Sequence, residues 1–122
     1  MKKILIIDDD ISVGEVLKDF LDELGYRTFY AADAKNGIII AERERPDLIL
    51  LDVLMPQIGG LEALKRIKEI LPDVIVVVMS GLQDEQVAKQ AIRRGAYDYI
   101  TKPFDLIYVQ SNLLARIFPE EV

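Results

Sequence analysis

The sequence predicts an α/β domain, in which helices cover both faces of a doubly wound parallel sheet. Short apolar runs of strand length recur along the chain, and amphipathic segments of helix length separate them. This alternation is the pattern of βα units that close a parallel sheet. Several of the runs are continuously aliphatic, as expected of strands that are buried on both faces. We therefore expect five βα units.

Five apolar runs have the length and composition of strands. We expect strands over residues 3–8, 26–30, 47–52, 74–79 and 97–100. The first, third and fourth runs are aliphatic almost throughout, which places them at the centre of the sheet. The second run mixes polar and aromatic side chains, which suits an edge strand.

The first helix has the clearest signature, because its apolar residues recur at i, i+3, i+4, i+7, i+8 and i+11. They are Val13, Val16, Leu17, Phe20, Leu21 and Leu24. Gly25 should end this helix and Gly95 the fourth, since glycine is favoured just past a helix C-terminus. Asp33 and Asp105 should cap the second and fifth helices, and the third is expected over residues 60–71.

The length and composition limit the class of protein. A chain of 122 residues with 51% hydrophobic and 30% charged residues fits one soluble domain, expected over residues 1–122. No apolar run approaches the ~20 residues that span a bilayer. The N-terminal run is too short for a signal peptide, so a cytoplasmic location without membrane attachment is expected. A net charge of −6 argues against direct nucleic-acid contact by this domain.

Two residue types are missing from the chain. It has no cysteine and no histidine. Disulfides, thiol catalysis, Ser-His catalysis and zinc sites built on histidine are therefore excluded. The chain also cannot carry a phosphohistidine of its own.

Polar residues follow four of the five predicted strands. They are Asp8 and Asp9, Asp52, Ser80, and Lys102. Parallel strands all point the same way, so these residues should converge on the sheet edge where open α/β sheets bind ligands. Asp47 and Asp73 lie at the other end, the first at the start of its strand and the second just before its strand. We expect those two at the opposite rim, as solvated turn residues.

Each of these residues also has an ordinary structural explanation when it is taken alone. Asp10 and its neighbours can cap the first helix, Asp52 can close a turn, Ser80 can belong to a turn, and Lys102 can be a surface lysine. Taken together, these residues indicate a site that binds a cation and a phosphoryl group. Two carboxylates about 4 Å apart repel by roughly 4 kcal/mol at an effective dielectric of 20, so a cluster favours a hard cation such as Mg²⁺. Metal, carboxylate, hydroxyl and ammonium are the parts that phosphoryl transfer requires.

The chain resembles the receiver domain of two-component response regulators. The resemblance lies in four segments that stand in order along the whole chain: Ile4-Leu5-Ile6-Ile7-Asp8-Asp9-Asp10, Leu50-Leu51-Asp52-Val53-Leu54-Met55-Pro56, Val78-Met79-Ser80-Gly81 and Gly95-Ala96-Tyr97-Asp98-Tyr99-Ile100-Thr101-Lys102-Pro103-Phe104. The separations of Asp52, Ser80 and Lys102 are also those of the family. The resemblance implies a flavodoxin-like sheet with strand order 2-1-3-4-5.

The resemblance also implies a chemical role for the strand ends. Asp52 would accept a phosphoryl group from the phosphohistidine of a sensor kinase or a phosphotransfer protein. Asp9, Asp52 and the backbone carbonyl of Leu54 would hold Mg²⁺, with Asp8 binding through a metal-bound water. Ser80 and Lys102 would bind the phosphoryl oxygens. The domain would then be a signalling switch that assists its own phosphorylation and dephosphorylation, and no dedicated enzyme.

A conformational switch is the second implication. Movement of Ser80 would let Tyr99 rotate inward and change the face made by helix 4, strand 5 and helix 5, with a cis peptide expected before Pro103. That face would control an output domain or an effector protein. Phosphorylation-dependent homodimers through this face are common when a DNA-binding domain follows, and the sequence leaves this open.

The chain departs mildly from the commonest family pattern. Ser80 replaces a more frequent threonine, and Gly59 stands where many members have Asp. Leu54 and Leu82, two residues past Asp52 and Ser80, are apolar and cannot orient an attacking water. We therefore expect a relatively long-lived phosphorylated form.

Two other functions compete with this interpretation. The segment from Asp8 to Ser12 also fits the Asp-x-Asp opening of haloacid-dehalogenase-type phosphatases, with Asp8 as nucleophile and Asp10 as acid. That family needs inserted structure which 122 residues hardly provide, and it leaves Asp52 unused. The other is a degenerate receiver that only binds proteins. Such modules typically lose an acid or the lysine, and this chain keeps both.

Overall fold

The computed structural model of the protein describes residues 1–120 and has a five-stranded parallel sheet at its centre. The strand order is β2-β1-β3-β4-β5, as the resemblance implied. The strands are β1 (Lys3–Ile7), β2 (Arg27–Ala31), β3 (Leu48–Asp52), β4 (Ile75–Ser80) and β5 (Asp98–Thr101). The three aliphatic runs are the inner strands and the mixed run is an edge strand, so both predictions are confirmed.

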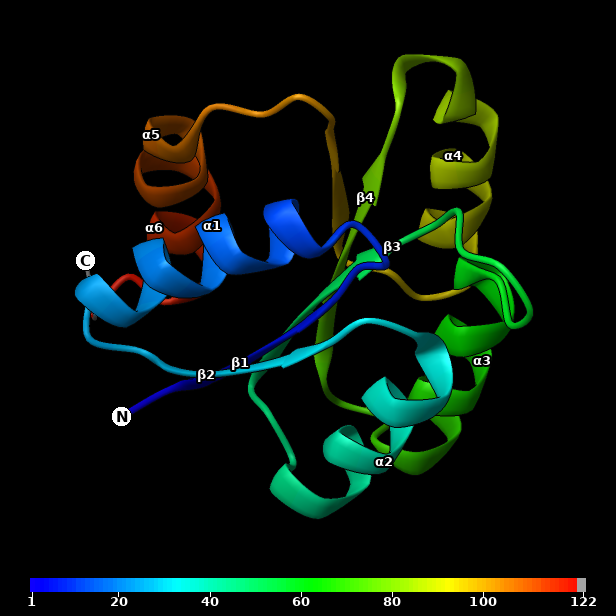
Figure 1. The fold of residues 1–122 in the computed structure, drawn as a ribbon, viewed down its shortest axis with the longest axis horizontal. Coiled ribbons are helices and arrows are strands. Elements are labelled where there is room, and N and C mark those ends of the chain that lie inside the picture. The colour runs from blue at the N-terminus through cyan, green and yellow to red at the C-terminus, as the bar shows by residue number, and fades with distance from the viewer. Residues whose placement is uncertain (121–122) are drawn as a thin grey trace.

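Helices cover both faces of the sheet, as Figure 1 shows. One face carries α2 (Ala34–Glu44), α3 (Gly60–Ile70) and α4 (Glu85–Arg93), the last preceded by the 3₁₀ turn η1 (Leu82–Asp84). The other carries α1 (Ile11–Glu23) and the C-terminal helical region α5 (Leu106–Tyr108), η2 (Val109–Leu114) and α6 (Ala115–Ile117). Alternate residues of each inner strand enter the two cores, so Ile4 and Ile6 face α1 while Leu5 and Ile7 face α2.

The predicted helix ends are confirmed at the capping residues. The Asp33 side chain accepts a hydrogen bond from the backbone of Asn36, and Asp105 accepts one from Ile107. Gly25 and Gly95 follow their helices with φ of 97° and 108°. The structure therefore bears out the prediction of where these four ends lie.

The fifth helix differs from the regular helix that was expected after Asp105. Its middle segment, η2, is π-helical. The buried residues Val109, Leu113, Leu114 and Phe118 are spaced at i, i+4, i+5 and i+9. The wider π turn brings this spacing to one face, whereas an α-helix would spread it over about half the helix circumference. Packing of that apolar face against the sheet explains the local change of helix type.

Among residues 1–120, no helix combines the length and apolar character that a membrane span requires.

Candidate functional site at the carboxyl edge of the sheet

The carboxyl edge of the sheet collects the polar residues that the sequence places after the strands. Asp8 follows β1, Asp52 ends β3, Ser80 ends β4 and Lys102 follows β5. The β3–β4 register pairs Asp52 with Met79, so Ser80 lies one residue past that pair. The backbone N–H of Lys102 donates to the Ser80 carbonyl at 2.6 Å, which ties the fifth strand end to the fourth.

Asp52 is a buried carboxylate whose charge is costly in this setting. Only 6% of the residue is exposed. Burial, reinforced by the charge of Asp8, raises the pKa of Asp52 to about 7, although Lys102 and a hydrogen bond from the backbone N–H of Leu54 (3.2 Å) act in the opposite direction. A carboxyl group with a pKa near neutrality is typical of a functional site.

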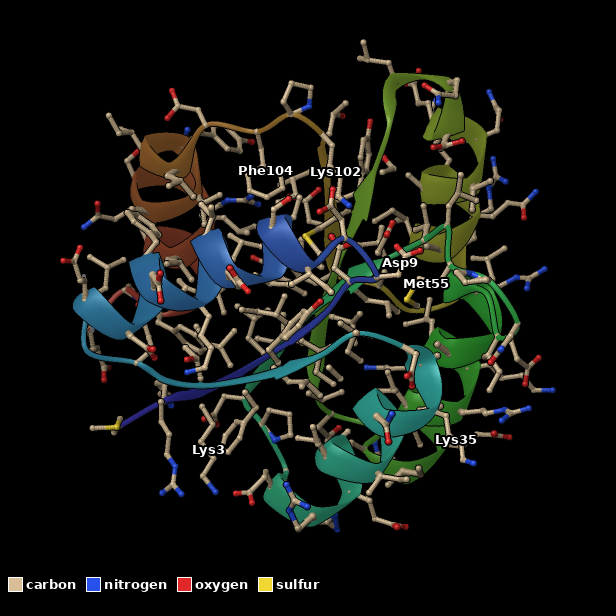
Figure 2. All side chains as sticks on the ribbon, in the orientation of Figure 1. Lys3, Asp9, Lys35, Met55, Lys102 and Phe104 are labelled. Carbon is tan, nitrogen blue, oxygen red and sulfur yellow. The ribbon has the colours of Figure 1, made fainter. Side chains whose placement is uncertain are left out.

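Lys102 supplies the counter-charge for the buried acids. Its ammonium nitrogen lies 2.6 Å from Asp8 Oδ2 and 3.5 Å from Asp52 Oδ2. Burial lowers the pKa of Lys102, but the two carboxylates outweigh that effect and hold the pKa above its ordinary value. The lysine therefore stays charged next to Asp52. Figure 2 shows Lys102 and Asp9 reaching this edge from different segments.

Three carboxylates lie close enough together to share a cation. One oxygen from each of Asp8, Asp9 and Asp52 lies within 4.8 Å of the other two. Asp8 and Asp52 are buried, whereas Asp9 is exposed and opens the cluster to solvent. The all-oxygen donor set fits Mg²⁺, which binds through a few carboxylates and keeps several waters.

Ser80 presents a hydroxyl that lacks a partner. The residue is 1% exposed, and within the described residues its Oγ has no hydrogen-bond partner. A buried hydroxyl without a partner costs free energy. A ligand oxygen at this edge would satisfy it, so the unpaired Oγ is consistent with a phosphoryl-binding role.

The residues assigned to the switch lie around this edge. The Lys102–Pro103 peptide bond is cis, as the resemblance implied. Tyr99 in β5 is half-buried and packs against the core on the α4 side. Ser80 pairs with Thr101 of β5, so Tyr99 and Pro103 both lie within two residues of its partner. Leu54 and Leu82, which were expected to affect the lifetime of the phosphorylated form, are exposed, at 52% and 78%.

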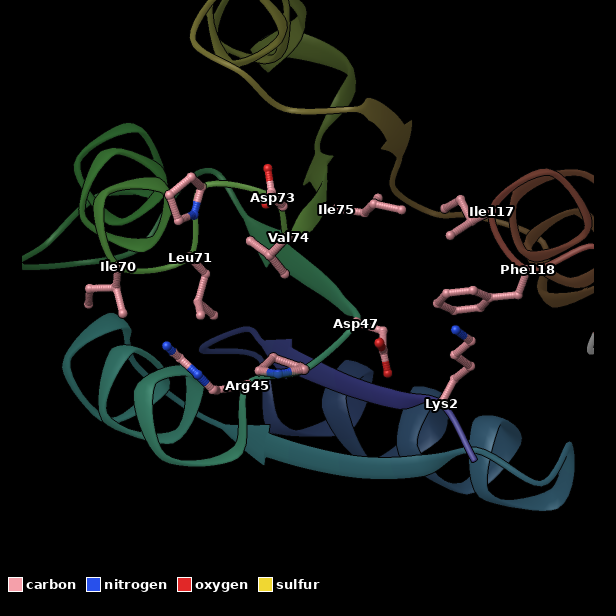
Figure 3. A pocket seen from close by; sticks show the side chains of 12 residues that line it. Lys2, Arg45, Asp47, Ile70, Leu71, Asp73, Val74, Ile75, Ile117 and Phe118 are labelled. Atoms are coloured by element: carbon pink, nitrogen blue, oxygen red, sulfur yellow. The ribbon is translucent and has the colours of Figure 1, made fainter.

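The opposite rim of the sheet holds the two acids that were expected there. Asp47 and Asp73 are exposed and line a cavity of about 520 Å³ together with Lys2 and Phe118 (Figure 3). The Asp47 carboxylate also accepts a 2.9 Å hydrogen bond from the backbone of Lys3. The sequence-based separation of the acids into two groups is therefore confirmed.

One residue of the site was missed from the sequence. The Tyr30 hydroxyl donates a 2.7 Å hydrogen bond to the backbone carbonyl of Asp8. Burial, followed by the charges of the nearby acids, raises the pKa of Tyr30, so the hydroxyl stays protonated as a donor. The feature of the sequence that could have pointed to a close contact here is Gly14, which lies inside α1 next to the Tyr30 ring.

The comparisons with known proteins agree with this geometry. Residues 4–114 match the response regulator receiver domain family. The chain belongs to this family. Receiver domains are the signalling switches of two-component systems, and phosphorylation and Mg²⁺ dependence are general properties of the family.

Curated relatives of the receiver domain include proteins of different lengths. Sporulation initiation phosphotransferase F of Bacillus subtilis is 36% identical over 86% of this chain and 85% of its own length. Chemotaxis protein CheY of Thermotoga maritima is 35% identical over 84% and 87%. The transcriptional regulatory protein CrdR of Helicobacter pylori is 40% identical over 98% of this chain, which spans only 56% of that protein.

Solved receiver structures superpose closely. The receiver domain of NtrX from Brucella abortus has a TM-score of 0.89 at 32% identity, covering 95% of this chain and 98% of that one. A response regulator receiver domain protein from Clostridium thermocellum also has a TM-score of 0.89, at 27% identity. These matches support the same flavodoxin-like receiver fold.

Proposed function

We propose that residues 1–122 act as one receiver domain that accepts a phosphoryl group on Asp52 and thereby switches a binding surface. The observation that carries the proposal is the environment of Asp52. Its carboxylate ends an inner strand, is 6% exposed, and lies 3.5 Å from the ammonium of Lys102. A buried carboxylate with a positioned cation is a suitable nucleophile for phosphoryl transfer.

The transfer forms one bond and breaks another. An Asp52 carboxylate oxygen attacks the phosphorus of a phosphohistidine, the P–O bond forms, and the P–N bond breaks. The electron pair of the P–N bond stays on the departing imidazole, which takes up a proton from solvent. Lys102 and Ser80 are placed to receive the phosphoryl oxygens, because the Ser80 hydroxyl is buried and unpaired within the described residues and the Lys102 ammonium already lies among the acids.

Asp8, Asp9, Asp52 and the Leu54 carbonyl are the groups that would hold Mg²⁺ in this proposal. Their oxygen donors support it, since three of the carboxylate oxygens lie within 4.8 Å of one another. When bound, Mg²⁺ supplies positive charge to offset the negative charge of the phosphoryl group and the acids. Lys102 and the bound cation would together hold Asp52 in its ionised, nucleophilic form.

The switch follows from the added charge. A phosphoryl group brings roughly −1.5 to −2 charge at pH 7 and three acceptor oxygens. It would draw the Ser80 hydroxyl toward Asp52 and pull Lys102 away from Asp8, where the ammonium now lies 2.6 Å from Oδ2. Tyr99 would then turn inward and alter the α4-β5-α5 face. That movement is the output of the domain in this proposal.

The partners of the domain follow from the same chemistry. The phosphoryl donor would be a sensor histidine kinase or a phosphotransfer protein, as for other receiver domains, and the phosphohistidine would belong to that partner because this chain has no histidine. The receiver of the signal would be an output domain or an effector protein. This chain spans 56% of the transcriptional regulatory protein CrdR and 85% of sporulation initiation phosphotransferase F, so its relatives include proteins with and without a large segment beyond the receiver domain.

Labelling with acetyl phosphate and Mg²⁺ tests the proposal. The chain should form a hydroxylamine-sensitive acyl phosphate, Asp52→Asn should abolish it, and Asp8→Asn should reduce it. Loss with Asp8→Asn alone would instead favour the phosphatase function, in which Asp8 is the nucleophile. A chain that takes no label from acetyl phosphate or from any histidine kinase would favour the degenerate, protein-binding receiver.

A further inference from the structure

Tyr30 contacts the acid cluster but has no part in the chemistry described above. It lies in β2, where it pairs with Ile6 of β1, and its hydroxyl reaches the Asp8 carbonyl at 2.7 Å. We propose that Tyr30 is a positioning residue, which fixes the Asp8–Asp9 peptide and thereby directs the Asp9 carboxylate into the Mg²⁺ site. This inference rests on the proposed function, because it concerns the same cation site.

The backbone around Asp9 is held on both sides. The Asp8 N–H donates to the Ala31 carbonyl at 3.1 Å, and the Asp10 N–H donates to Asp8 Oδ1 at 2.9 Å. A peptide is planar, so the direction of the Asp8 carbonyl also fixes the position of the Asp9 Cα. Tyr30 determines that direction through its hydrogen bond.

Asp9 depends on this backbone for its orientation. Its side chain is exposed, and within residues 1–120 no hydrogen bond or ion pair to its carboxylate is seen. Asp8 differs, because its side chain is fully buried and bound by Lys102. Groups that orient a metal ligand before the ion arrives raise the affinity of the site.

Gly14 of α1 provides the space in which the Tyr30 ring lies. A Cβ added to Gly14 would lie 2.2 Å from Tyr30 Cε1 and 2.6 Å from Cζ, which is closer than any side chain can pack. Glycine inside a helix is less favourable than alanine. The close approach of the tyrosine ring explains why a glycine stands at this position.

Tyr30→Phe tests the hydrogen bond, since it removes the hydroxyl and keeps the ring on Gly14. The Mg²⁺ concentration that gives half-maximal labelling by acetyl phosphate should rise about 3- to 10-fold. The rate at saturating Mg²⁺ should stay within about twofold of the wild-type rate, because the reacting groups are unchanged. Binding of Mn²⁺ alone, followed by the electron paramagnetic resonance signal of the free ion, should weaken by the same factor.

Tyr97→Phe is the matched control for the loss of a hydroxyl. Tyr97 is 46% exposed and precedes β5, at the opposite edge of the sheet from the acids. Its Mn²⁺ affinity and its half-saturating Mg²⁺ concentration should equal those of the wild type. The two Tyr→Phe variants therefore differ only in which hydroxyl is removed.

Gly14→Ala independently tests the contact between Gly14 and the Tyr30 ring. The added methyl group should displace Tyr30 and weaken Mn²⁺ binding about as much as Tyr30→Phe does. In a Tyr30→Ala background the clash is removed, so Gly14→Ala should raise the melting temperature, as alanine does in an ordinary helix interior. A fall in melting temperature in that background would contradict the proposed contact.

The outcomes separate this inference from the function on which it rests. Equal Mn²⁺ affinities for wild type, Tyr30→Phe and Tyr97→Phe would overturn the positioning role while leaving the cation site in place. A lower saturating rate with unchanged half-saturating Mg²⁺ would also overturn it, because it would mark a general structural defect. A wild-type chain that neither binds Mn²⁺ nor is labelled by acetyl phosphate would overturn the proposed function itself.

Discussion

Asp52 combines two properties that oppose each other, a negative charge and a position that is almost closed to water. Its pKa is raised to about 7 by burial and by the charge of Asp8. A folded-state pKa above the ordinary value of 3.8 means that ionisation of Asp52 disfavours the folded state. The resulting loss in the free energy of unfolding is absent below about pH 4, grows as the pH rises, and is complete above about pH 7.

Asp52→Asn should therefore stabilise the metal-free domain at high pH only. We expect a gain of about 1–3 kcal/mol in the free energy of unfolding near pH 8 and little change near pH 4. Urea unfolding at the two pH values measures the difference. Asp33→Asn is the control, because Asp33 caps α2 and Asn is an equally good cap. A gain that is the same at both pH values would contradict the raised pKa.

Leu54 is the residue that should govern the lifetime of the phosphorylated form. Its side chain is 52% exposed beside Asp52 and offers no group to orient a water. Leu54→Asn should accelerate loss of the acyl phosphate several-fold, whereas Leu54→Met should leave the rate near that of the wild type. Decay of labelled protein after removal of the donor measures both rates. The hypothesis is wrong if the amide brings no acceleration.

At the scale of elements, the first residue of α3 packs closely against the backbone that directly follows Asp52 at the end of β3. A Cβ on Gly60, the first residue of α3, would lie 2.3 Å from Val53 Cα, whereas one on Gly59 would meet nothing within 4 Å. Gly60→Ala should therefore destabilise the fold by about 1–3 kcal/mol, although alanine favours helices. Gly59→Ala should be close to neutral. Equal melting temperatures for the two variants would contradict the close approach.

Sequence periodicity predicted the elements better than their internal geometry. The aliphatic runs around Ile6, Leu50 and Val77 identified the inner strands, because strands buried on both faces are apolar throughout. The π-helical turn over Val109–Leu114 was not foreseen. An i, i+4, i+5 spacing of apolar residues is also tolerated at the margin of an α-helical face, so packing against the finished sheet decides between the two.

For the candidate site too, the sequence predicted which residues come together but not the distances between them. Strand direction was enough to bring Asp8, Asp52 and Lys102 to one edge. Distances such as the 2.6 Å between Lys102 and Asp8 required the structure. Tyr30 was missed because its role depends on contacts of β2 with the β1–α1 loop and with Gly14. A glycine inside a helix indicates a close approach, but it does not identify Tyr30 as the residue that approaches.

At the scale of the whole molecule, one end of the sheet gathers three carboxylates against the single ammonium of Lys102, so a bound cation should relieve the remaining repulsion. The chain has a net charge of −6, and three of its acids meet at this edge. Millimolar Mg²⁺ should therefore raise the melting temperature by about 2–6 °C, since a ligand of the folded state stabilises it by mass action. Asp9→Asn should lose most of that gain in a thermal unfolding experiment. The control is a Mg²⁺-free buffer in which Na⁺ gives the same ionic strength.

The most direct test of the central claim is to locate the phosphoryl group in the chain. After reaction with acetyl phosphate and Mg²⁺, borohydride reduction and peptide mapping by mass spectrometry should place a single modification on Asp52. Removal of Mg²⁺ should abolish it. Modification of Asp8 with Asp52 left free would contradict the account, as would labelling that persists undiminished in Asp52→Asn.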